Sequence, residues 1–273
     1  MKIENCKLKI VHCRTLAFVI VFLSVAFVPM TLSAVSGTTS KPFHYEDDRL
    51  GEKKDESEKF KFARIKIAPM YPGACLGDHP CEMWSHDYPD AGLHFSKILS
   101  ELSKLQVVLD ENEYIFSFAD PNLMKYPFAY MCEVSVMQLT DDEIKGMREY
   151  LLRGGFLLVD DFRRPSQMQH FQYYLKQAFP EPEYQMKPLD ITHPIFNCFF
   201  SIKTLDVRTP YREPGKPEFL GIEDKHGRLM MIINYNNDVS DWWQWSNDPF
   251  QPIDDTNSAY KFGVNYAFYA LTH

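Results

Sequence analysis

The chain has 273 residues, 45% of them hydrophobic, and a formal net charge of −8 at pH 7. Such a composition is ample for a buried core. The acidic balance disfavours a protein that neutralises nucleic-acid phosphates or adheres to an anionic membrane surface, so neither partner is expected.

The first 36 residues have the layout of a secretory signal peptide. A basic start precedes an apolar run over residues 16–28, which is shorter than the ~20 residues that a membrane-spanning helix needs. Small residues at Ala34 and Ser36 are typical of signal-peptidase cleavage, and we expect cleavage after Ser36. A retained N-terminal anchor is the alternative. Either way, we expect export to the periplasm or cell surface, with membrane contact only through this segment.

The residues that follow the leader predict a linker and then one domain. Residues 37–59 are charged and nearly free of aliphatic side chains, which is typical of a flexible segment. Residues 60–273 are expected to form a single globular domain. Because residues 1–36 carry four Lys or Arg and one Glu, the 237 residues after them have a net charge of −11, against −8 for the whole chain.

Strand and helix patterns alternate from residue 60 onward. Apolar and polar residues alternate over 60–67, which predicts a strand, and residues 91–105 predict a helix. Short apolar runs predict two further strands, at 106–109 and 128–131.

A capping box marks the start of the next helix. The Thr140 hydroxyl can accept a hydrogen bond from the Glu143 amide while the Glu143 carboxylate bonds back to the Thr140 amide. Gly154 and Gly155 are expected to end this helix, since glycine readily adopts the positive φ found at helix C-termini.

The second half of the domain continues the alternation. All-apolar runs at 156–159 and 229–233 predict strands buried on both faces, and helices are expected at 165–179 and 258–271. This order predicts an α/β fold with a mainly parallel sheet covered by helices on both faces.

Polar side chains follow several predicted strands, at the rim where open parallel sheets bind ligands. Asp160 and Asp161 come directly after one strand, and two adjacent carboxylates can raise each other's pKa or hold a divalent cation together. Alternatively, one caps the following helix and the other is solvated. The candidate ligand-binding residues at this rim are Trp84, Asp87, Asp90, Asn234, Asn236, Asn237 and Asp238.

The segment from 234 to 245 concentrates amides, carboxylates and three of the four tryptophans. Aromatic faces beside amide groups suit a sugar or another neutral polar ligand. The alternative is a turn with the tryptophans packed beneath it. We favour packing for the tryptophans and a binding role for Asn236 and Asp238.

Three further features bear on chemistry. Pro194 favours an extended His193, which can act as a base or ligand or can bond a neighbouring loop. Cys132 follows a strand, but no Gly-x-Ser-x-Gly elbow or Ser/His/Asp order accompanies it to support a nucleophile. The sequence contains no glycine-rich phosphate loop, so no nucleotide cofactor is expected.

Four cysteines follow the leader, and two of them lie close together. In an exported chain, Cys75 and Cys81 are expected to form a disulfide within a Pro- and Gly-rich loop. A zinc site with His79 and His86 is the alternative, although the usual paired Cys-x-x-Cys spacing is missing.

Several stretches together resemble one known family. They are FKFARIKI (60–67), WSHDYPD (84–90), YPFAYM (126–131), LTDDEIKGMREYLLRGGFLLVDDF (139–162), HPIF (193–196), GRLMMIINYNND (227–238) and AYKFGVNYAFYALTH (259–273). Over nearly all of residues 60–273 the chain resembles the domain of unknown function 4159. The resemblance implies a flavodoxin-like three-layer α/β/α sandwich of the class I glutamine-amidotransferase-like group, with larger relatives that are membrane-anchored.

The departures from that group also matter. Asp160-Asp161-Phe162 stands where amidotransferases carry a cysteine nucleophile elbow, so amidotransferase activity is not expected. The HPIF stretch is similar to the trehalose-utilisation branch of the superfamily, an analogy at the level of fold that hints at sugars. The insert 69–81 and Cys132-Glu133 are particular to this chain.

We therefore expect a domain that binds a small polar ligand, such as a glycan fragment, with a divalent cation as an optional cofactor. The expected rim pocket consists of Asp87, Asp90, Asp160, Asp161, His193, Asn236 and Asp238. One alternative is a hydrolase that uses Asp160, Asp161 and His193 as acid and base or as a metal site. The other is a scaffold that binds envelope proteins in a membrane-associated complex.

Overall fold

The computed structural model describes residues 59–69, 83–110, 114–211 and 215–273. The leader, the linker up to residue 58 and the Cys75–Cys81 pair lie outside the described residues, so those predictions stay predictions. Within these ranges, no helix combines the length and the apolarity that crossing a membrane requires.

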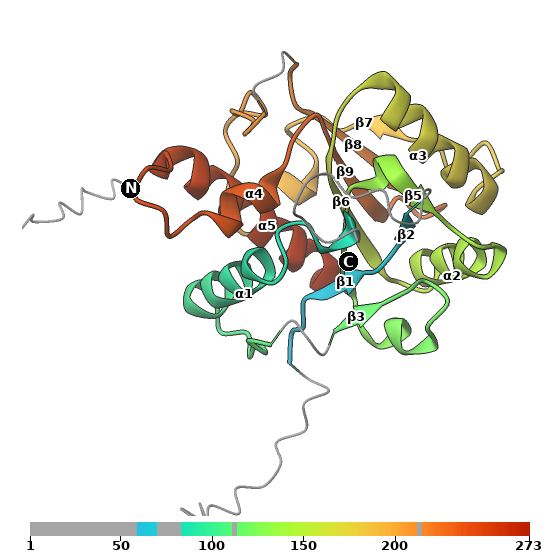
Figure 1. Ribbon diagram of the computed structural model, residues 1–273, viewed down its shortest axis with the longest axis horizontal. Helices are drawn as coiled ribbons and strands as arrows, with labels where there is room; N and C mark the ends of the chain where they lie inside the picture. Colours follow the sequence, from blue (N-terminus) through green and yellow to red (C-terminus); the bar gives the residue numbers. More distant parts are fainter. Residues whose placement is uncertain (1–58, 70–82, 111–113, 212–214) are drawn as a thin grey trace, which may run out of the picture. The chain divides into compact units, whose positions relative to one another are not determined.

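A sheet of seven strands runs through the centre of the described domain (Figure 1). Its strands are β1 (Ala63–Ile65), β3 (Ile115–Phe116), β4 (Phe128–Cys132), β6 (Phe156–Phe162), β7 (Lys187–Pro188), β8 (Glu218–Glu223) and β9 (Leu229–Tyr235). They lie in the order β3-β1-β4-β6-β9-β8-β7, and β8 is antiparallel to both of its neighbours. A separate pair joins β2 (Ala68–Pro69) and β5 (Met137–Gln138).

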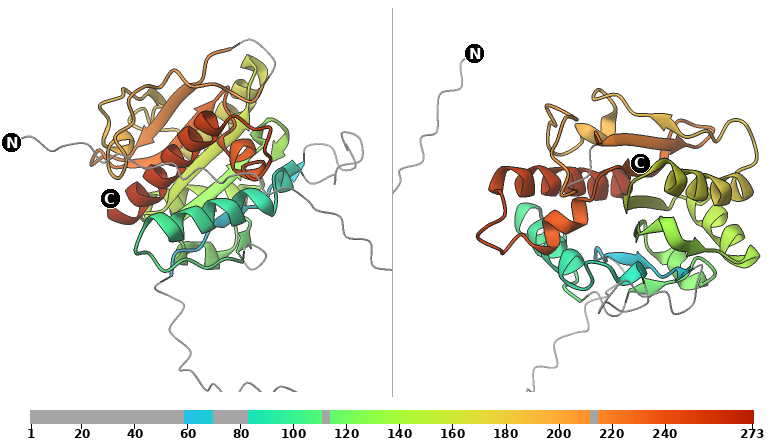
Figure 2. Two further views of the ribbon diagram at one scale, coloured as in Figure 1. Left: turned by 90° about the vertical axis from the view of Figure 1, so that its left-hand side faces the viewer. Right: turned by 45° about the horizontal axis from the view of Figure 1, so that its top comes forward.

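Helices cover both faces of the sheet (Figure 2). One face carries α1 (Asp90–Leu102), α4 (Val239–Gln244) and α5 (Ile253–Thr272), and the other carries α2 (Asp141–Leu152) and α3 (Pro165–Ala178). The short 3₁₀ helices are η2 (Met83–Ser85), η3 (Pro121–Lys125), η4 (Val134–Val136) and η5 (Pro194–Phe196). The domain is thus an α/β protein with helices on both sides of an open, mostly parallel sheet.

Alternating side chains divide the interior into two cores. Along β6, Leu157 and Val159 pack with the core of α2 and α3, whereas Phe156 and Leu158 pack with the core of α1, α4 and α5. Successive residues of a strand point to opposite faces, so an all-apolar strand is buried on both sides. This confirms the buried parallel strands predicted at 156–159 and 229–233.

The predicted start and end of α2 are confirmed, whereas α1 ends at Leu102 rather than at 105 and α5 begins at Ile253 rather than at 258. Thr140 and Glu143 form the predicted capping box at the start of α2, and Gly154 just beyond its end has a φ of 109°. The strand predicted at 106–109 is wrong, because Val107 makes only an isolated bridge to Phe60. The strand beside β1 is instead β3, and the sequence patterns missed β8 and α4.

The order of the parallel strands places a switch point in the sheet. Numbered along the chain, β1, β3, β4, β6 and β9 lie in the order 2-1-3-4-5. The chain therefore leaves β1 toward one edge through β3 and returns to the other side of β1 at β4. In open α/β sheets, ligands bind outside the carboxyl ends of the strands at such a switch point.

Candidate functional site

Four potential ligands converge at the carboxyl ends of the strands. His86, Asp87, Asp161 and Asp238 each offer one ligand atom, and these atoms all lie within 4.8 Å of one another. His86 and Asp87 belong to the loop after β1, Asp161 lies near the end of β6, and Asp238 follows β9. We call these four residues the carboxylate cluster. It lies at the rim where the switch point predicts a ligand site.

The backbone around the cluster adopts an uncommon conformation. Asp87, Glu133 and Asp161 have φ values of 60°, 53° and 53°, in the left-handed region. An L-residue in this region costs about 1 kcal/mol or more, and such strain concentrates at functional sites. In β6 the register against β9 shifts between Val159 and Phe162, which accommodates Asp161 inside the strand.

Asp161 is held by two hydrogen bonds from outside β6. Its Oδ2 lies 2.6 Å from Nδ1 of His86, and its Oδ1 accepts a hydrogen bond of 2.6 Å from the Tyr211 hydroxyl. Although burial opposes ionisation, these two bonds keep the pKa of Asp161 below its usual value. Asp161 is therefore the ionised member at the centre of the cluster.

Asp87 and Asp238 meet at the Ser240 hydroxyl. Ser240 Oγ lies 2.6 Å from Asp87 Oδ2 and 2.9 Å from Asp238 Oδ1, and Asp238 also accepts from the Asp241 amide as the N-cap of α4. Among the described residues, Asp87 Oδ1 has no hydrogen-bond partner although its side chain is fully buried, and it lies 3.7 Å from His86 Nε2. A buried carboxylate oxygen without a donor is costly and points to a ligand.

Asp160 has a different task from its neighbour Asp161. Its Oδ1 accepts from the Asn234 amide at 3.1 Å, and its Oδ2 accepts from the backbone amides of Val239 at 2.8 Å and Ser240 at 3.1 Å. Asp160 therefore anchors the first turn of α4 against β6. The structure thus separates the adjacent pair: Asp161 belongs to the cluster, and Asp160 positions the helix whose N-cap is Asp238.

The rim contains more buried negative charge than positive charge. Burial raises the pKa of Asp87, Asp160 and Asp238, and the Asp161 charge raises each further. Burial also raises the pKa of the nearby Glu133 to about 8. Buried carboxylates without enough counter-charge must take up protons or bind a cation. A divalent cation would supply the missing charge.

His86 provides positive charge within the cluster. Its hydrogen bond to Asp161 raises its pKa to about 9, even though burial opposes the charged form. His86 is therefore an imidazolium at neutral pH and must release a proton before it can ligate a metal. Its side chain is 45% exposed, so the cluster is reached from the side of His86.

His193 does not join the cluster, which corrects the predicted rim pocket. Its ring lies 5.9 Å from that of Tyr269, whose hydroxyl accepts from the amide of Leu229, the first residue of β9. This is the amino end of the sheet. The reason is a turn at Asp190, whose carboxylate accepts from the Thr192 amide, so the chain reverses and no parallel strand leads into His193. The structure therefore does not bring His193 together with Asp160 or Asp161.

The structure also places most of the other predicted site residues outside the carboxylate cluster. Trp84 is buried in the core, and Asp90 is exposed at the start of α1. Asn236 adopts a left-handed turn and donates to the Lys216 carbonyl. Asn234 is buried between Asp160 and Tyr266, to which it is hydrogen-bonded. Of the predicted ligand-binding set, the structure brings only Asp87 and Asp238 into the cluster.

The tryptophans after β9 pack rather than form an open platform. Trp242 and Trp243 are buried in the core with α1 and α5, and Trp243 stacks on Phe95 with ring centroids 4.6 Å apart. The prediction that tryptophans pack beneath this segment is confirmed for these two. Trp245 is 47% exposed at the end of α4.

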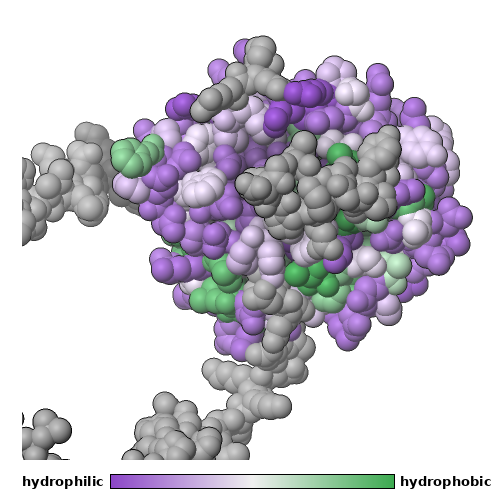
Figure 3. All heavy atoms as spheres, viewed as in Figure 1, coloured by the Kyte–Doolittle hydropathy of each residue, from purple (hydrophilic) through white to green (hydrophobic). Residues whose placement is uncertain are grey.

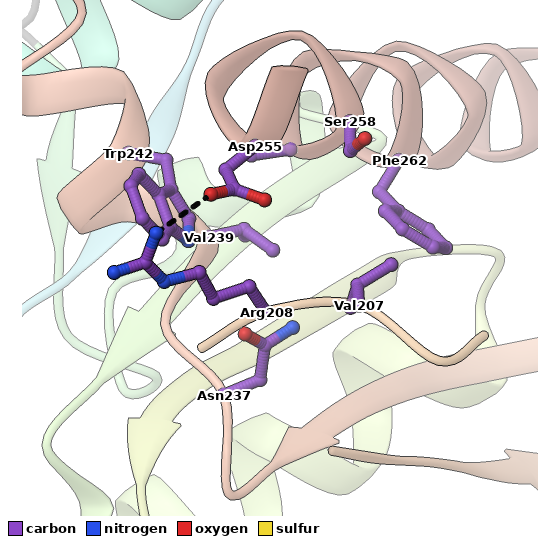
Figure 4. Close-up of a pocket in the computed structure, with 9 residues that line it drawn as sticks. Val207, Arg208, Asn237, Val239, Trp242, Asp255, Ser258 and Phe262 are labelled. Atoms are coloured by element: carbon purple, nitrogen blue, oxygen red, sulfur yellow. Dashed lines mark hydrogen bonds and ion pairs between the residues drawn. The ribbon is translucent and has the colours of Figure 1, made fainter. Parts of the chain in front are cut away.

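A small hollow adjoins the cluster through Asn237 (Figure 4). Val207, Trp242 and Phe262 form apolar walls, and Arg208 pairs with Asp255 at 3.4 Å. The Oδ1 of Asn237 is buried and has no hydrogen-bond partner within the described residues. The hollow measures about 10 Å³, room for roughly one water molecule. It is too small for a sugar ring.

Sequence reasoning missed Tyr211 and treated His86 only as an alternative zinc ligand. The signal for His86 was present, because it follows the first strand directly beside Asp87. Tyr211 had no such signal, since it lies in a long connection far from any parallel strand and reaches Asp161 only through tertiary folding.

The comparisons agree with the resemblance found in the sequence. No curated protein matches the chain. A family model described as "Domain of unknown function (DUF4159)" matches residues 62–271, a span that begins just before β1, ends within α5 and contains the carboxylate cluster. The chain therefore belongs to the DUF4159 family.

Proposed function

We propose that this domain binds a divalent cation through His86, Asp87, Asp161 and Asp238. The observation that carries the proposal is the convergence of one imidazole and three buried carboxylates within 4.8 Å. The hydrogen bond from His86 to Asp161 supports it, because an imidazolium beside a metal-ligating carboxylate can hold the site together until the cation replaces its proton.

The donor set favours a transition-metal dication. Ca²⁺ and Mg²⁺ prefer oxygen ligands alone, whereas imidazole nitrogen suits Zn²⁺ and its neighbours in the first transition row. A site with one nitrogen and three carboxylates lies between these classes. We infer that Mn²⁺ or Zn²⁺ binds more tightly than Ca²⁺ or Mg²⁺.

We further propose that the bound cation recruits a small polar ligand through oxygen atoms. The cluster lies at the switch point of the sheet, and the partly exposed side chain of His86 marks the side from which a ligand would reach the ion. A glycan fragment with adjacent hydroxyl groups is a suitable chemical class. The buried Trp242 and Trp243 are not available to stack on its rings.

A metal-dependent hydrolase is the second candidate, and Glu133 favours it. The Glu133 Oε1 lies 3.8 Å from His86 Nδ1, its side chain is 18% exposed, and it stands outside the four ligands. Once the charge of a bound cation lowers its raised pKa, a carboxylate in this position is placed to accept a proton from a water molecule at the site. In this form the hydrolase uses Glu133 and does not involve His193.

The protein-interaction scaffold has weaker support. Most described residues on the face shown in Figure 3 are hydrophilic, and the hydrophobic ones form separate small patches. Phe250 and Ile253, in and just after the connection between α4 and α5, are 92% and 73% exposed, but neighbouring Asp248, Asp254 and Asp255 interrupt the apolar surface. A docking surface usually presents a larger contiguous patch.

Two further inferences concern the fold class and the compartment. The strand order 2-1-3-4-5 supports a flavodoxin-like domain, and the class I glutamine-amidotransferase-like assignment rests on the sequence resemblance. Residues 1–36 support export to the periplasm or cell surface by their pattern alone.

Calorimetric titration of the chelator-treated full chain tests the cation site. We expect one Mn²⁺ or Zn²⁺ per chain, and an Asp161→Asn variant should bind at least about 100-fold more weakly because it loses the central ionised ligand. Asp224→Asn, at the opposite end of the sheet, is the matched control and should bind normally. Absence of saturable binding in the wild type would refute the proposal.

The loaded protein also tests the hydrolase candidate. Model ester, amide and glycoside substrates should be turned over with Mn²⁺ or Zn²⁺, and Glu133→Gln should abolish turnover without loss of the cation. Cation binding without turnover of any of these substrates would contradict the hydrolase candidate and favour the binding domain.

A further inference from the structure

One buried cation, Arg64, lies beside the carboxylate cluster and is not a member of it. Arg64 is the middle residue of β1 and only 1% exposed. Its neighbours Ala63 and Ile65 pack with the core of α2 and α3, so Arg64 extends from the opposite face of the sheet, where Phe62 also lies. Its guanidinium lies 4.8 Å from the centroid of the Tyr130 ring, a cation–π contact.

The hydrogen bonds of Arg64 join the loops that lead to the cluster. Its Nη1 donates to the carbonyl oxygens of Trp84 at 3.3 Å and His86 at 3.0 Å, and it lies 3.7 Å from the sulfur of Cys132. The two carbonyls belong to the loop that carries His86 and Asp87, and Cys132 is the last residue of β4. One side chain therefore connects the ends of the two strands that flank the switch point.

These contacts restrain a strained stretch of backbone. Asp87 has a φ of 60°, and Glu133, next to Cys132, has a φ of 53°. Left-handed residues persist only where the surrounding structure fixes them. The bond from Arg64 to the His86 carbonyl is made at the peptide that links His86 to Asp87, so it fixes the backbone of two cluster residues directly.

We propose that Arg64 is the positioning residue of the cation site: it sets the backbone that carries His86 and Asp87 and does not touch the ion. This inference rests on the proposed cation binding. All three contacts are made by Nη1, whose two N–H groups are shared among the two carbonyls and the sulfur while the guanidinium plane lies against the ring of Tyr130. A lysine retains the positive charge but loses that geometry, which makes Arg64→Lys the informative substitution.

Arg228 offers a matched control at the opposite end of the sheet. It also donates to two backbone carbonyls, to Gly155 at 3.1 Å and Leu151 at 2.5 Å, and only 15% of its side chain is exposed. Arg228→Lys should therefore disturb the fold about as much as Arg64→Lys while leaving the cluster untouched. The pair separates a loss of stability from a loss of positioning.

The experiment titrates Mn²⁺ into three full-length proteins: wild type, Arg64→Lys and Arg228→Lys. We expect the dissociation constant to rise at least about tenfold for Arg64→Lys and to stay within about twofold for Arg228→Lys. The electron paramagnetic resonance spectrum of bound Mn²⁺ should broaden only in Arg64→Lys, because a shifted His86 and Asp87 change the symmetry around the ion. A purely structural role would leave this spectrum unchanged.

The outcomes distinguish failure of the positioning role of Arg64 from failure of the proposed cation binding. No Mn²⁺ binding by the wild type would refute the cation site itself. Wild-type affinity and spectrum in Arg64→Lys would overturn the positioning role and leave the site intact. If Arg64→Lys does not fold, Arg64→Gln, which keeps a planar donor, takes its place. Failure of both to fold while Arg228→Lys folds would mark Arg64 as a stability residue and also overturn the inference.

Discussion

The two ends of the central sheet use charge in opposite ways. At the amino end, Arg228 bonds Asp224 at 3.2 Å and the carbonyls of Gly155 and Leu151, so its donors are matched with acceptors. At the carboxyl end, three buried aspartates gather around the imidazole of His86. At the amino end, these matched contacts stabilise the fold. The carboxyl end keeps buried ionisable groups that folding alone does not favour, which supports the proposed cation site.

The two ends of the sheet also differ in backbone conformation. Within the described residues, the non-glycine positions with left-handed φ are Asp87, Glu133, Asp161, Arg164 and Asn236. All five lie at or just beyond the carboxyl ends of β1, β4, β6 and β9. In the described parts of the chain, this strain and the unbalanced charge therefore lie at the same end of the sheet, which supports the proposed cation site there.

The largest expected effect is on stability and concerns Asp160. Asp160→Ala leaves two backbone amides of α4 and the Asn234 amide without an acceptor in a buried place. We expect the free energy of unfolding to fall by about 3 kcal/mol. Asp224→Ala, at the less buried end, should cost only about 1 kcal/mol. Urea unfolding followed by circular dichroism measures both, and equal losses would remove the distinction between the two ends.

Replacing aspartate by asparagine should change stability with opposite sign at the two ends. In chelator-treated protein, Asp87→Asn removes a buried carboxyl group whose pKa is raised by burial and whose Oδ1 has no hydrogen-bond donor, so we expect a gain of about 1 kcal/mol. Asp224→Asn removes a partner of Arg228 and should lose about 1 kcal/mol. The same unfolding assay applies. A loss at Asp87 as large as that at Asp224 would contradict the view that the rim carries excess negative charge.

The smallest effect is a pH dependence at the amino end. Although burial opposes it, hydrogen bonds from the amides of His226 and Arg228 and the nearby guanidinium lower the pKa of Asp224. A carboxyl whose pKa is lower in the folded state stabilises the fold above its unfolded pKa of about 3.9, and this contribution is lost as the pH falls through the folded value. The stability difference between wild type and Asp224→Asn should therefore shrink from pH 7 to pH 3. A constant difference would mean that the pairing does not set the pKa.

The sequence predicts the layers of this fold better than it predicts the membership of the site. Periodicity and capping are local, so α2, β6 and the capping box at Thr140 could be identified directly. The rule that ligands bind beyond strand ends brought Asp87, Asp161 and Asp238 to one rim. It failed for His193, because a turn at Asp190 sends the chain to the other end.

Two parts of the site depend on contacts that no local pattern encodes. Arg64 occupies a polar position of an alternating strand, and such a position usually faces solvent. Its burial follows only from the packing of α1 and the loop after β1 over this face of the sheet. The separate roles of Asp160 and Asp161 depend on the register shift in β6, which arises from pairing with β9 rather than from the sequence of β6 alone.

Anomalous diffraction from crystals of the full chain soaked in Mn²⁺ tests the central claim most directly. The account predicts one strong anomalous peak, with His86, Asp87, Asp161 and Asp238 all within about 2.0–2.5 Å of the ion. The peak should vanish in Asp161→Asn crystals and remain in Asp224→Asn crystals. Manganese found only at exposed carboxylates, or none at the rim, would contradict the assignment of this cluster as a cation site.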